Sequence, residues 1–261
     1  MPNRYHEANR NLWNASASSW ARRADGYGIW KRCHQDPSLA LHEAELKWLQ
    51  DVHGKTVAVL GSGDNRVVFA LSGLGAKVTS VDFSEQQLTI ARQRAAEIGL
   101  DVRFVLADVT DLSGVSDETF DITYTGGHVA VWVSDLARFY AEAARILKVG
   151  GLFVSSEYHP FRRVWKDSPD RFELSSNYFD RGPRCYTATR DLLKPVHGNV
   201  EQFEFHWTVG DYLSAVLAAG CQIVHVEEFG DGREEWEGAP LAGLPARLLI
   251  VSKRTRIDNG V

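Results

Sequence analysis

The stretch KTVAVLGSGDN, residues 55–65, decides the fold of this protein. Residues 55–60 form a short apolar run, which is typical of a buried strand, and glycines follow it directly. Because Gly61 and Gly63 lack a Cβ atom, the backbone can turn tightly there and a ligand can approach it closely. An apolar helical segment follows at 67–74. This strand, turn and helix predict the ligand-binding start of a parallel α/β sheet.

Strands and helices alternate along most of the remaining chain. We expect strands at 77–81, 102–106, 120–124, 152–156, 222–228 and 247–252, and helices at 84–98, 135–147 and 209–219. Ser84 followed by Gln87 resembles a capping box at the start of the first of these helices, and Gly99 is a typical residue beyond its end. The alternation predicts an α/β fold, a mostly parallel sheet with helices on both faces.

Two segments depart from this rhythm. Residues 1–53 are helical and rich in aromatic side chains, and residues 37–50 within them have the apolar spacing of an amphipathic helix. Residues 158–206 have no long apolar period, and we expect them to form in part a β-hairpin from 176–190 and 200–207. The expected organisation is a helical N-terminal lid at 1–53, a core at 54–157 and 207–255, and a covering insertion at 158–206.

Composition argues against several classes of protein. The chain of 261 residues is 44% hydrophobic and 24% charged, which suits a globular protein with a sizeable core. Its net charge of −5 argues against a nucleic-acid partner, because affinity for phosphates comes largely from Lys and Arg. The three cysteines form no CxxC pair, so we expect neither a disulfide scaffold nor a metal site. No apolar run approaches the roughly 18 residues of a membrane span, and no signal-peptide pattern opens the chain, so we expect a cytoplasmic protein.

A carboxylate follows each of the next two expected strands. Asp82 lies 21 residues after Gly61, where a carboxylate can accept both hydroxyls of a ribose. Asp108 stands just past the third strand, where a carboxylate could accept the amino group of adenine. Arg66 occupies the third glycine position of the GxGxxG pattern, which weighs against a dinucleotide because that glycine lets the helix pack closely beneath a pyrophosphate.

The pattern of these residues resembles that of the class I methyltransferases. VLGSG at 59–63 is similar to their first motif, VDFS at 81–84 to their acidic motif and ADV at 107–109 to their adenine motif. LKVGG at 147–151 resembles their LKPGG segment, with Val149 in place of proline. The resemblance implies a Rossmann-like, seven-stranded sheet whose last strand is antiparallel, and S-adenosyl-L-methionine as the cofactor.

The resemblance also implies which residues contact the cofactor. Phe83 is expected to pack on adenine and Gln87 to lie near the ribose, whereas Asn65 stands in a loop that departs from the family's pattern. Thr125 follows the fourth strand at the same edge, and the segment around Trp20 resembles the lid of small-molecule methyltransferases. The expected cofactor-binding residues are Gly61, Ser62, Gly63, Asn65, Asp82, Phe83, Gln87, Asp108, Val109, Thr125 and Trp20.

The acceptor side of the expected site rests on fewer signals. Methyl transfer needs the acceptor atom held in line, and a base helps only when the acceptor loses a proton. His128 and His159 follow the fourth and fifth strands and His206 ends the insertion, so these histidines are the candidate catalytic bases. The expected residues of the substrate pocket are the aromatic side chains Trp13, Trp132, Tyr158, Phe161 and Tyr178.

The sequence thus predicts a monomeric or homodimeric enzyme that transfers a methyl group from S-adenosylmethionine to an O, N or C atom of a small-molecule metabolite. Three alternatives stay open at this point: a methyltransferase acting on protein or nucleic acid, an NAD-dependent oxidoreductase, and a non-catalytic adenosylmethionine-binding protein.

Overall fold

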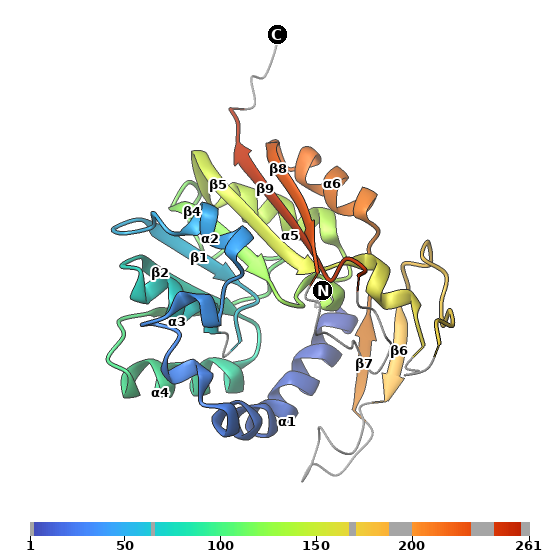
Figure 1. Ribbon diagram of the computed structural model, residues 1–261, viewed down its shortest axis with the longest axis horizontal. Helices are drawn as coiled ribbons and strands as arrows, with labels where there is room; N and C mark the ends of the chain where they lie inside the picture. The colour runs from blue at the N-terminus through green and yellow to red at the C-terminus, as the bar shows by residue number, and fades with distance from the viewer. Residues whose placement is uncertain (1–2, 64–65, 167–170, 188–199, 231–242, 257–261) are drawn as a thin grey trace.

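A seven-stranded sheet forms the centre of the computed structural model, which describes residues 3–63, 66–166, 171–187, 200–230 and 243–256 (Figure 1). Its strands are β1 (Thr56–Leu60), β2 (Lys77–Asp82), β3 (Arg103–Leu106), β4 (Phe120–Gly126), β5 (Leu147–Tyr158), β8 (Cys221–Phe229) and β9 (Arg247–Arg254). The strand order is β3-β2-β1-β4-β5-β9-β8, in which β9 runs antiparallel to the six other strands. The predicted fold is therefore confirmed, and its antiparallel strand distinguishes it from the 3-2-1-4-5-6 order of dinucleotide-binding sheets.

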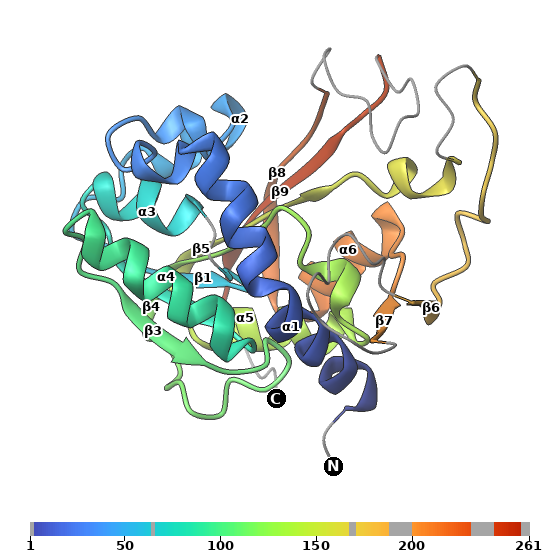
Figure 2. The same ribbon diagram turned by 90° about the horizontal axis from the view of Figure 1, so that it is seen from below.

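Helices cover both faces of this sheet. The helices are α1 (Arg4–Tyr27), α2 (Glu43–Leu49), α3 (Arg66–Gly73), α4 (Glu85–Glu97), α5 (Leu136–Arg145) and α6 (Val209–Ala218), and the 3-10 turns are η1 (Ile29–Lys31), η2 (Pro37–Leu39), η3 (Ala130–Trp132) and η4 (Pro160–Val164). Figures 1 and 2 show α2, α3 and α4 on one face and α5 and α6 on the other. Within the described residues, no helix is both long and apolar enough to cross a membrane.

The apolar run at 55–60 supplies both faces of the core. Val57 and Val59 pack with α2 and α3, whereas Ala58 and Leu60 pack with α5. Because successive side chains of a strand point to opposite faces, a strand covered by helices on both sides must be apolar throughout. The uninterrupted apolar pattern is thus explained by the position of β1 at the middle of the sheet.

Local signals fixed some helix boundaries and not others. Ser84 caps α4 as expected, since its Oγ accepts the N–H of Gln87 at 3.2 Å. The single helix expected over 37–50 is wrong, because the chain forms η2 and then α2. His42 separates them with an extended backbone and accepts the N–H of Ala44 at 3.2 Å through its Nδ1.

The expected hairpin of the insertion is present. β6 (Arg184–Thr187) pairs antiparallel with β7 (Glu201–Glu204), and residues 188–199 lie outside the described part of the chain. Figure 2 shows β7 beside α1, at the edge where the parallel strands end. The hairpin therefore lies next to the N-terminal helix.

Helix α1 crosses the carboxyl edge of the sheet between α4 and β7 (Figure 2). The hydroxyl of Ser84 donates to Asn14 Oδ1 at 2.7 Å, and Arg94 of α4 pairs with Asp25 at 2.9 Å. On the other side, the amide of Asn9 exchanges two hydrogen bonds of 2.8 Å with the backbone of Phe203. These contacts hold α1 across the ends of the parallel strands.

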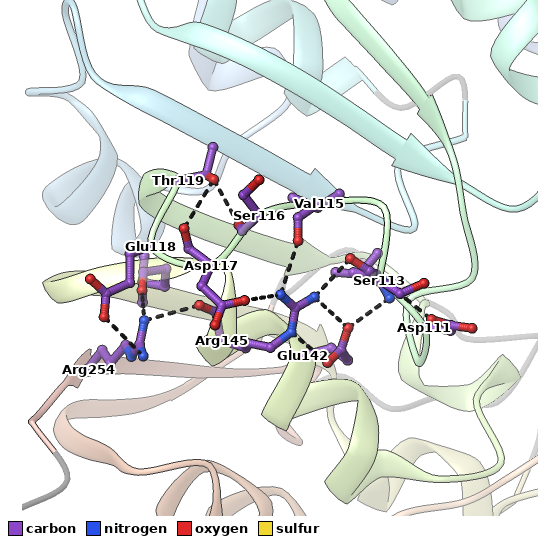
Figure 3. A network of polar contacts seen from close by, with 12 residues as sticks. Asp111, Ser113, Val115, Ser116, Asp117, Glu118, Thr119, Glu142, Arg145 and Arg254 are labelled. Carbon is purple, nitrogen blue, oxygen red and sulfur yellow. Dashed lines mark hydrogen bonds and ion pairs between the residues drawn. The ribbon is translucent and has the colours of Figure 1, made fainter.

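A polar network closes the opposite edge of the sheet (Figure 3). The Arg145 guanidinium, at the end of α5, donates to the carbonyls of Leu112 and Val115 at 2.8 and 3.0 Å and also pairs with Glu142 and Asp117. Arg254 of β9 donates in turn to the Arg145 carbonyl at 3.1 Å. The network ties the loop between β3 and β4 to the helix and to the last strand, away from the ligand edge.

Candidate active site

A cavity of about 490 Å³ opens at the carboxyl edge of the sheet, beneath α1. This is the edge at which open α/β sheets bind their ligands. The residues expected at the site that do line the cavity are Trp13, Trp20, Gly61, Ser62, Gly63, Asp82, Phe83, Gln87, Asp108, Val109, His128, Trp132 and Tyr158. The cavity thus brings residues between Trp13 and Trp132 together with Tyr158, which ends β5.

The turn after β1 is shaped by its glycines. Gly61 has a φ of +65°, and a Cβ there would lie 2.4 Å from Cγ1 of Val129, so a side chain has no room. Gly63, with a φ of +52°, donates its N–H to Oδ2 of Asp82 at 2.8 Å. Oδ1 of Asp82 accepts the N–H of Ser84 at 2.8 Å. Both oxygens of the buried Asp82 carboxylate are therefore held in place by backbone groups beside the turn.

Ser62 and Gln87 both line the cavity, but of the two only Gln87 has a side-chain acceptor without a described partner there. The Ser62 side chain turns away, because its hydroxyl bonds to Ser80 Oγ at 2.6 Å. Gln87 is buried, and its Oε1 has no hydrogen-bond partner among the residues that the structure describes. A buried acceptor without a donor costs about 1–3 kcal/mol, so this atom is suited to accept a hydrogen bond from a ligand.

Asp108 is joined to the N-terminal helix by a residue that the sequence analysis did not identify. His6 Nδ1 lies 2.6 Å from Oδ2 of Asp108, and His6 Nε2 accepts the N–H of Ser134 at 3.0 Å. Because Nε2 accepts, Nδ1 carries the proton and donates it to the carboxylate. Burial raises the pKa of Asp108, but hydrogen bonds from His6 and Thr110 outweigh that effect and hold the pKa below its ordinary value. No local pattern in the sequence signals this contact, since His6 and Asp108 are 102 residues apart.

Aromatic side chains wall the other half of the cavity. The ring of Trp13 meets the edge of Trp132 at a centroid distance of 5.4 Å and lies 6.2 Å from Trp20. The ring of His128 packs edge-on against Trp132 at 5.6 Å and against Tyr158 at 5.0 Å. Residues of α1, of the loop after β4 and of β5 thus form a flat-walled, apolar space.

His128 connects this space to a second, smaller cavity. The smaller cavity has a volume of about 20 Å³ and is also lined by Glu157, Arg163 and His206. Burial lowers the pKa of His128 well below its ordinary value, and the charges of Arg163 and Arg247 lower it further. The imidazole is therefore neutral at neutral pH and able to accept a proton.

Glu157 holds the loop that carries His128. Its Oε2 accepts the N–H of Val129 at 3.1 Å, and its Oε1 accepts the hydroxyl of Thr125 at 3.3 Å. Burial raises the pKa of Glu157 to about 7, although these hydrogen bonds and the charge of Arg247 oppose the shift. Glu157 is buried behind the loop and does not line the larger cavity.

Several expected site residues lie elsewhere. His159 pairs through Nε2 with Glu228 at 2.7 Å and caps η4, while His206 Nε2 lies 3.2 Å from Glu204 beside the smaller cavity. Neither histidine lines the larger cavity. Asn65 lies outside the described residues, and Thr125 is fully buried against Glu157.

Phe161 and Tyr178 were expected in the substrate pocket, but neither lines the larger cavity. Phe161 packs edge-on against Trp165 at 5.3 Å. The hydroxyl of Tyr178 accepts the N–H of Val209, the first residue of α6, at 3.0 Å. Both side chains therefore make structural contacts outside the larger cavity.

Comparisons with known proteins agree with this geometry. Residues 58–155 match the family model of a methyltransferase domain. The chain is 34% identical over 177 residues to the uncharacterized methyltransferase YbaJ of Bacillus subtilis, an alignment that covers 66% of this chain and 68% of the relative. It is 28% identical over 194 residues to the ubiquinone biosynthesis O-methyltransferase of Xanthomonas oryzae, covering 73% of this chain and 76% of that protein.

A solved methyltransferase structure is similar to this chain over most of its length. The S-adenosylmethionine-dependent methyltransferase of Mesorhizobium loti superimposes with a TM-score of 0.61 at 27% identity, over 82% of this chain and 99% of that one. The glycine turn, the carboxylate that ends β2, the carboxylate that follows β3 and the antiparallel last strand are the features that the family resemblance predicted. The chain therefore belongs to the class I methyltransferases, and S-adenosylmethionine is its cofactor.

Proposed function

We propose that the protein methylates an O, N or C atom of a small molecule that lies in the same cavity as the cofactor. The observation that carries the proposal is the cavity itself, which runs beneath α1 from Asp108 to Tyr158. Its volume of about 490 Å³ lies in the range of small-molecule sites. The bound cofactor supplies an activated methyl group, and the protein must hold the acceptor in line with it and exclude water.

The residues at the β2–β3 end fit the cofactor. The carboxylate of Asp82, fixed by two backbone N–H groups, keeps lone pairs for the ribose hydroxyls. The unpartnered Oε1 of Gln87 offers a further acceptor there. Asp108 would accept the amino group of adenine, between the apolar side chains of Phe83 and Val109.

The aromatic half would hold the acceptor. Trp13, Trp132 and Tyr158 suit a flat molecule, because aromatic faces stack on planar groups. The neutral imidazole of His128 would accept the proton that an ionisable oxygen or nitrogen loses as it attacks. Similarity to proteins named as ubiquinone biosynthesis O-methyltransferases favours oxygen as the acceptor atom.

Residues 1–53 and 158–206 would cover the acceptor. Trp13 and Trp20 of α1 close the cavity from above, and the hairpin of β6 and β7 lies beside α1. A cavity covered in this way favours a small acceptor over a protein or nucleic acid chain, and the net charge of −5 also disfavours nucleic acid.

The size of the acceptor is tested by following a labelled methyl group. The protein is incubated with S-adenosylmethionine carrying a tritiated methyl group and with a cell extract, and the products are separated by size. We expect a new labelled compound, separated from S-adenosylmethionine by chromatography, in the small-molecule fraction, and much less of it when Asp82→Ala is used. Label in protein or nucleic acid would contradict the proposal.

The pair of His6 and Asp108 gives a second prediction for this function. His6→Ala should weaken binding of S-adenosylhomocysteine by about 1.5 kcal/mol, roughly tenfold, because the adenine-side carboxylate loses its charge-assisted donor. Calorimetry measures the change, and His225→Ala is the control, since His225 pairs with Glu227 on β8, away from the cavity. Tighter binding would instead show that His6 competes with adenine for Asp108.

A further inference from the structure

Arg247 places a cation in the acceptor half of the cavity. It is the first residue of β9, pairs in register with Tyr158 of β5 and lines the cavity. Its guanidinium carbon lies 4.3 Å from the centroid of the Tyr158 ring. A ring beneath the guanidinium occupies none of its N–H donors, so the planar fork of donors stays available to another group.

Arg247 forms no direct ion pair with a carboxylate among the residues that the structure describes, although its charge acts on the buried Glu157. Two other arginines at or near the cavity are paired, Arg94 with Asp25 at 2.9 Å and Arg163 with Glu204 at 3.1 Å. Arg23 and Arg66 also line the cavity but are exposed to solvent. Arg247 is half-buried, and a guanidinium remains charged at every accessible pH. A partly desolvated cation with free donors favours an anion supplied by a ligand.

The position of Arg247 separates it from the cofactor end. Between β1, which carries the glycine turn, and β9 the sheet order places β4 and β5. Adjacent strands lie about 4.8 Å apart, so β9 is roughly 14 Å from β1 across the sheet. Asp82 and Asp108 lie on the opposite side of β1, on β2 and just beyond β3. An anion at Arg247 would therefore belong to the acceptor.

A second charged group of the cavity, Glu45, argues for an anion of low charge. Glu45 of α2 also lines the cavity, and its oxygens accept the hydroxyl of Tyr124 at 2.7 Å and the N–H of His42 at 2.9 Å. Its carboxylate is thus engaged, but its negative charge disfavours a dianion such as phosphate in the same cavity. A carboxylate matches both the charge and the fork of Arg247.

We propose that Arg247 binds a carboxylate of the methyl acceptor, which makes the acceptor a flat organic acid. The inference rests on the proposed small-molecule function. It assigns Arg247 to acceptor specificity, with Tyr158 holding the guanidinium in place.

The test compares 3,4-dihydroxybenzoate with 3,4-dihydroxybenzamide, which has the same shape without the charge. Both are titrated into the wild-type protein saturated with S-adenosylhomocysteine. The acid should bind about tenfold or more tightly than the amide. No preference for the acid, including no binding of either compound, would overturn the proposal.

Variants then assign the effect to Arg247. Arg247→Met should abolish the preference, and Arg247→Lys should keep only part of it because the fork of donors is lost. Arg66→Met is the control, since Arg66 also lines the cavity but is exposed to solvent. A preference that survives in Arg247→Met would assign the carboxylate to another residue and overturn the proposal.

Cofactor binding distinguishes the possible failures. Wild-type protein that does not bind S-adenosylhomocysteine would contradict the proposed function itself. The compound 5′-methylthioadenosine lacks the carboxylate of S-adenosylhomocysteine. If Arg247→Met weakens the binding of S-adenosylhomocysteine but not that of 5′-methylthioadenosine, Arg247 binds the cofactor and the inference fails. We expect both affinities to stay within about twofold of the wild type.

Discussion

Replacing Asp82 with alanine should weaken cofactor binding by about 2 kcal/mol or more, roughly thirtyfold. The carboxylate is buried and lies at the end of β2, where its oxygens also accept the N–H groups of Gly63 and Ser84. The variant loses the acceptor for the ribose hydroxyls and leaves two backbone donors without a partner. Calorimetric titration with S-adenosylhomocysteine measures the loss.

Two further variants test the role of Asp82. Asp82→Asn should weaken binding less than Asp82→Ala, because one side-chain oxygen remains as an acceptor. It should still weaken binding, because the new NH₂ group faces a backbone N–H donor. Asp101→Ala is the matched control, since Asp101 is an exposed acid in the turn before β3. An Asp82→Ala protein that folds and binds the cofactor with unchanged affinity would remove Asp82 from the site.

Replacing His128 with alanine should lower turnover by about 10²-fold or more while cofactor affinity stays unchanged. His128 is the histidine among the three candidates that lines the larger cavity. His206→Ala should retain most activity, and His159→Ala should lower the melting temperature more than turnover, since it breaks the contact with Glu228. Equal rates for wild type and His128→Ala would mean that the reaction needs no base at this position.

The pH dependence of turnover separates His128 from Glu157. If His128 must be neutral, turnover falls as pH drops through its lowered pKa, so the midpoint lies below the ordinary value of 6.5. If Glu157 must be ionised, the midpoint lies near its raised pKa of about 7. We expect the first result, because Glu157 is buried behind the loop that it positions.

Most of the fold followed from patterns that act over short distances. The apolar run before Gly61 identified β1 because both faces of a central strand are buried. Ser84 identified the start of α4 because a cap depends only on residues within one turn. The helix expected over 37–50 failed because apolar spacing does not show where the backbone breaks, here at His42.

The residues of the site also differ in how far the sequence could predict their positions. The turn at Gly61 and Gly63 and the carboxylate of Asp82 were expected from the sequence, and all three line the cavity. They are close in the chain or end neighbouring parallel strands, so spacing alone predicts their proximity. His159, by contrast, follows β5 as expected but turns toward Glu228 of β8, a contact with no local signal.

The sequence by itself predicted the fold class and which strand ends face the cavity, because glycine turns and strand-end carboxylates act through local geometry, and the resemblance of its motifs to the class I methyltransferases implied the cofactor. Only the tertiary structure joined His6 to Asp108, across 102 residues, and brought Arg247 over Tyr158. It also selected His128 from three candidate histidines as the one that faces the larger cavity. These contacts depend on how α1 crosses the sheet and how β9 pairs antiparallel with β5. The sequence does not show them directly, because strand pairing and helix docking are decided by packing between segments that are distant in the chain.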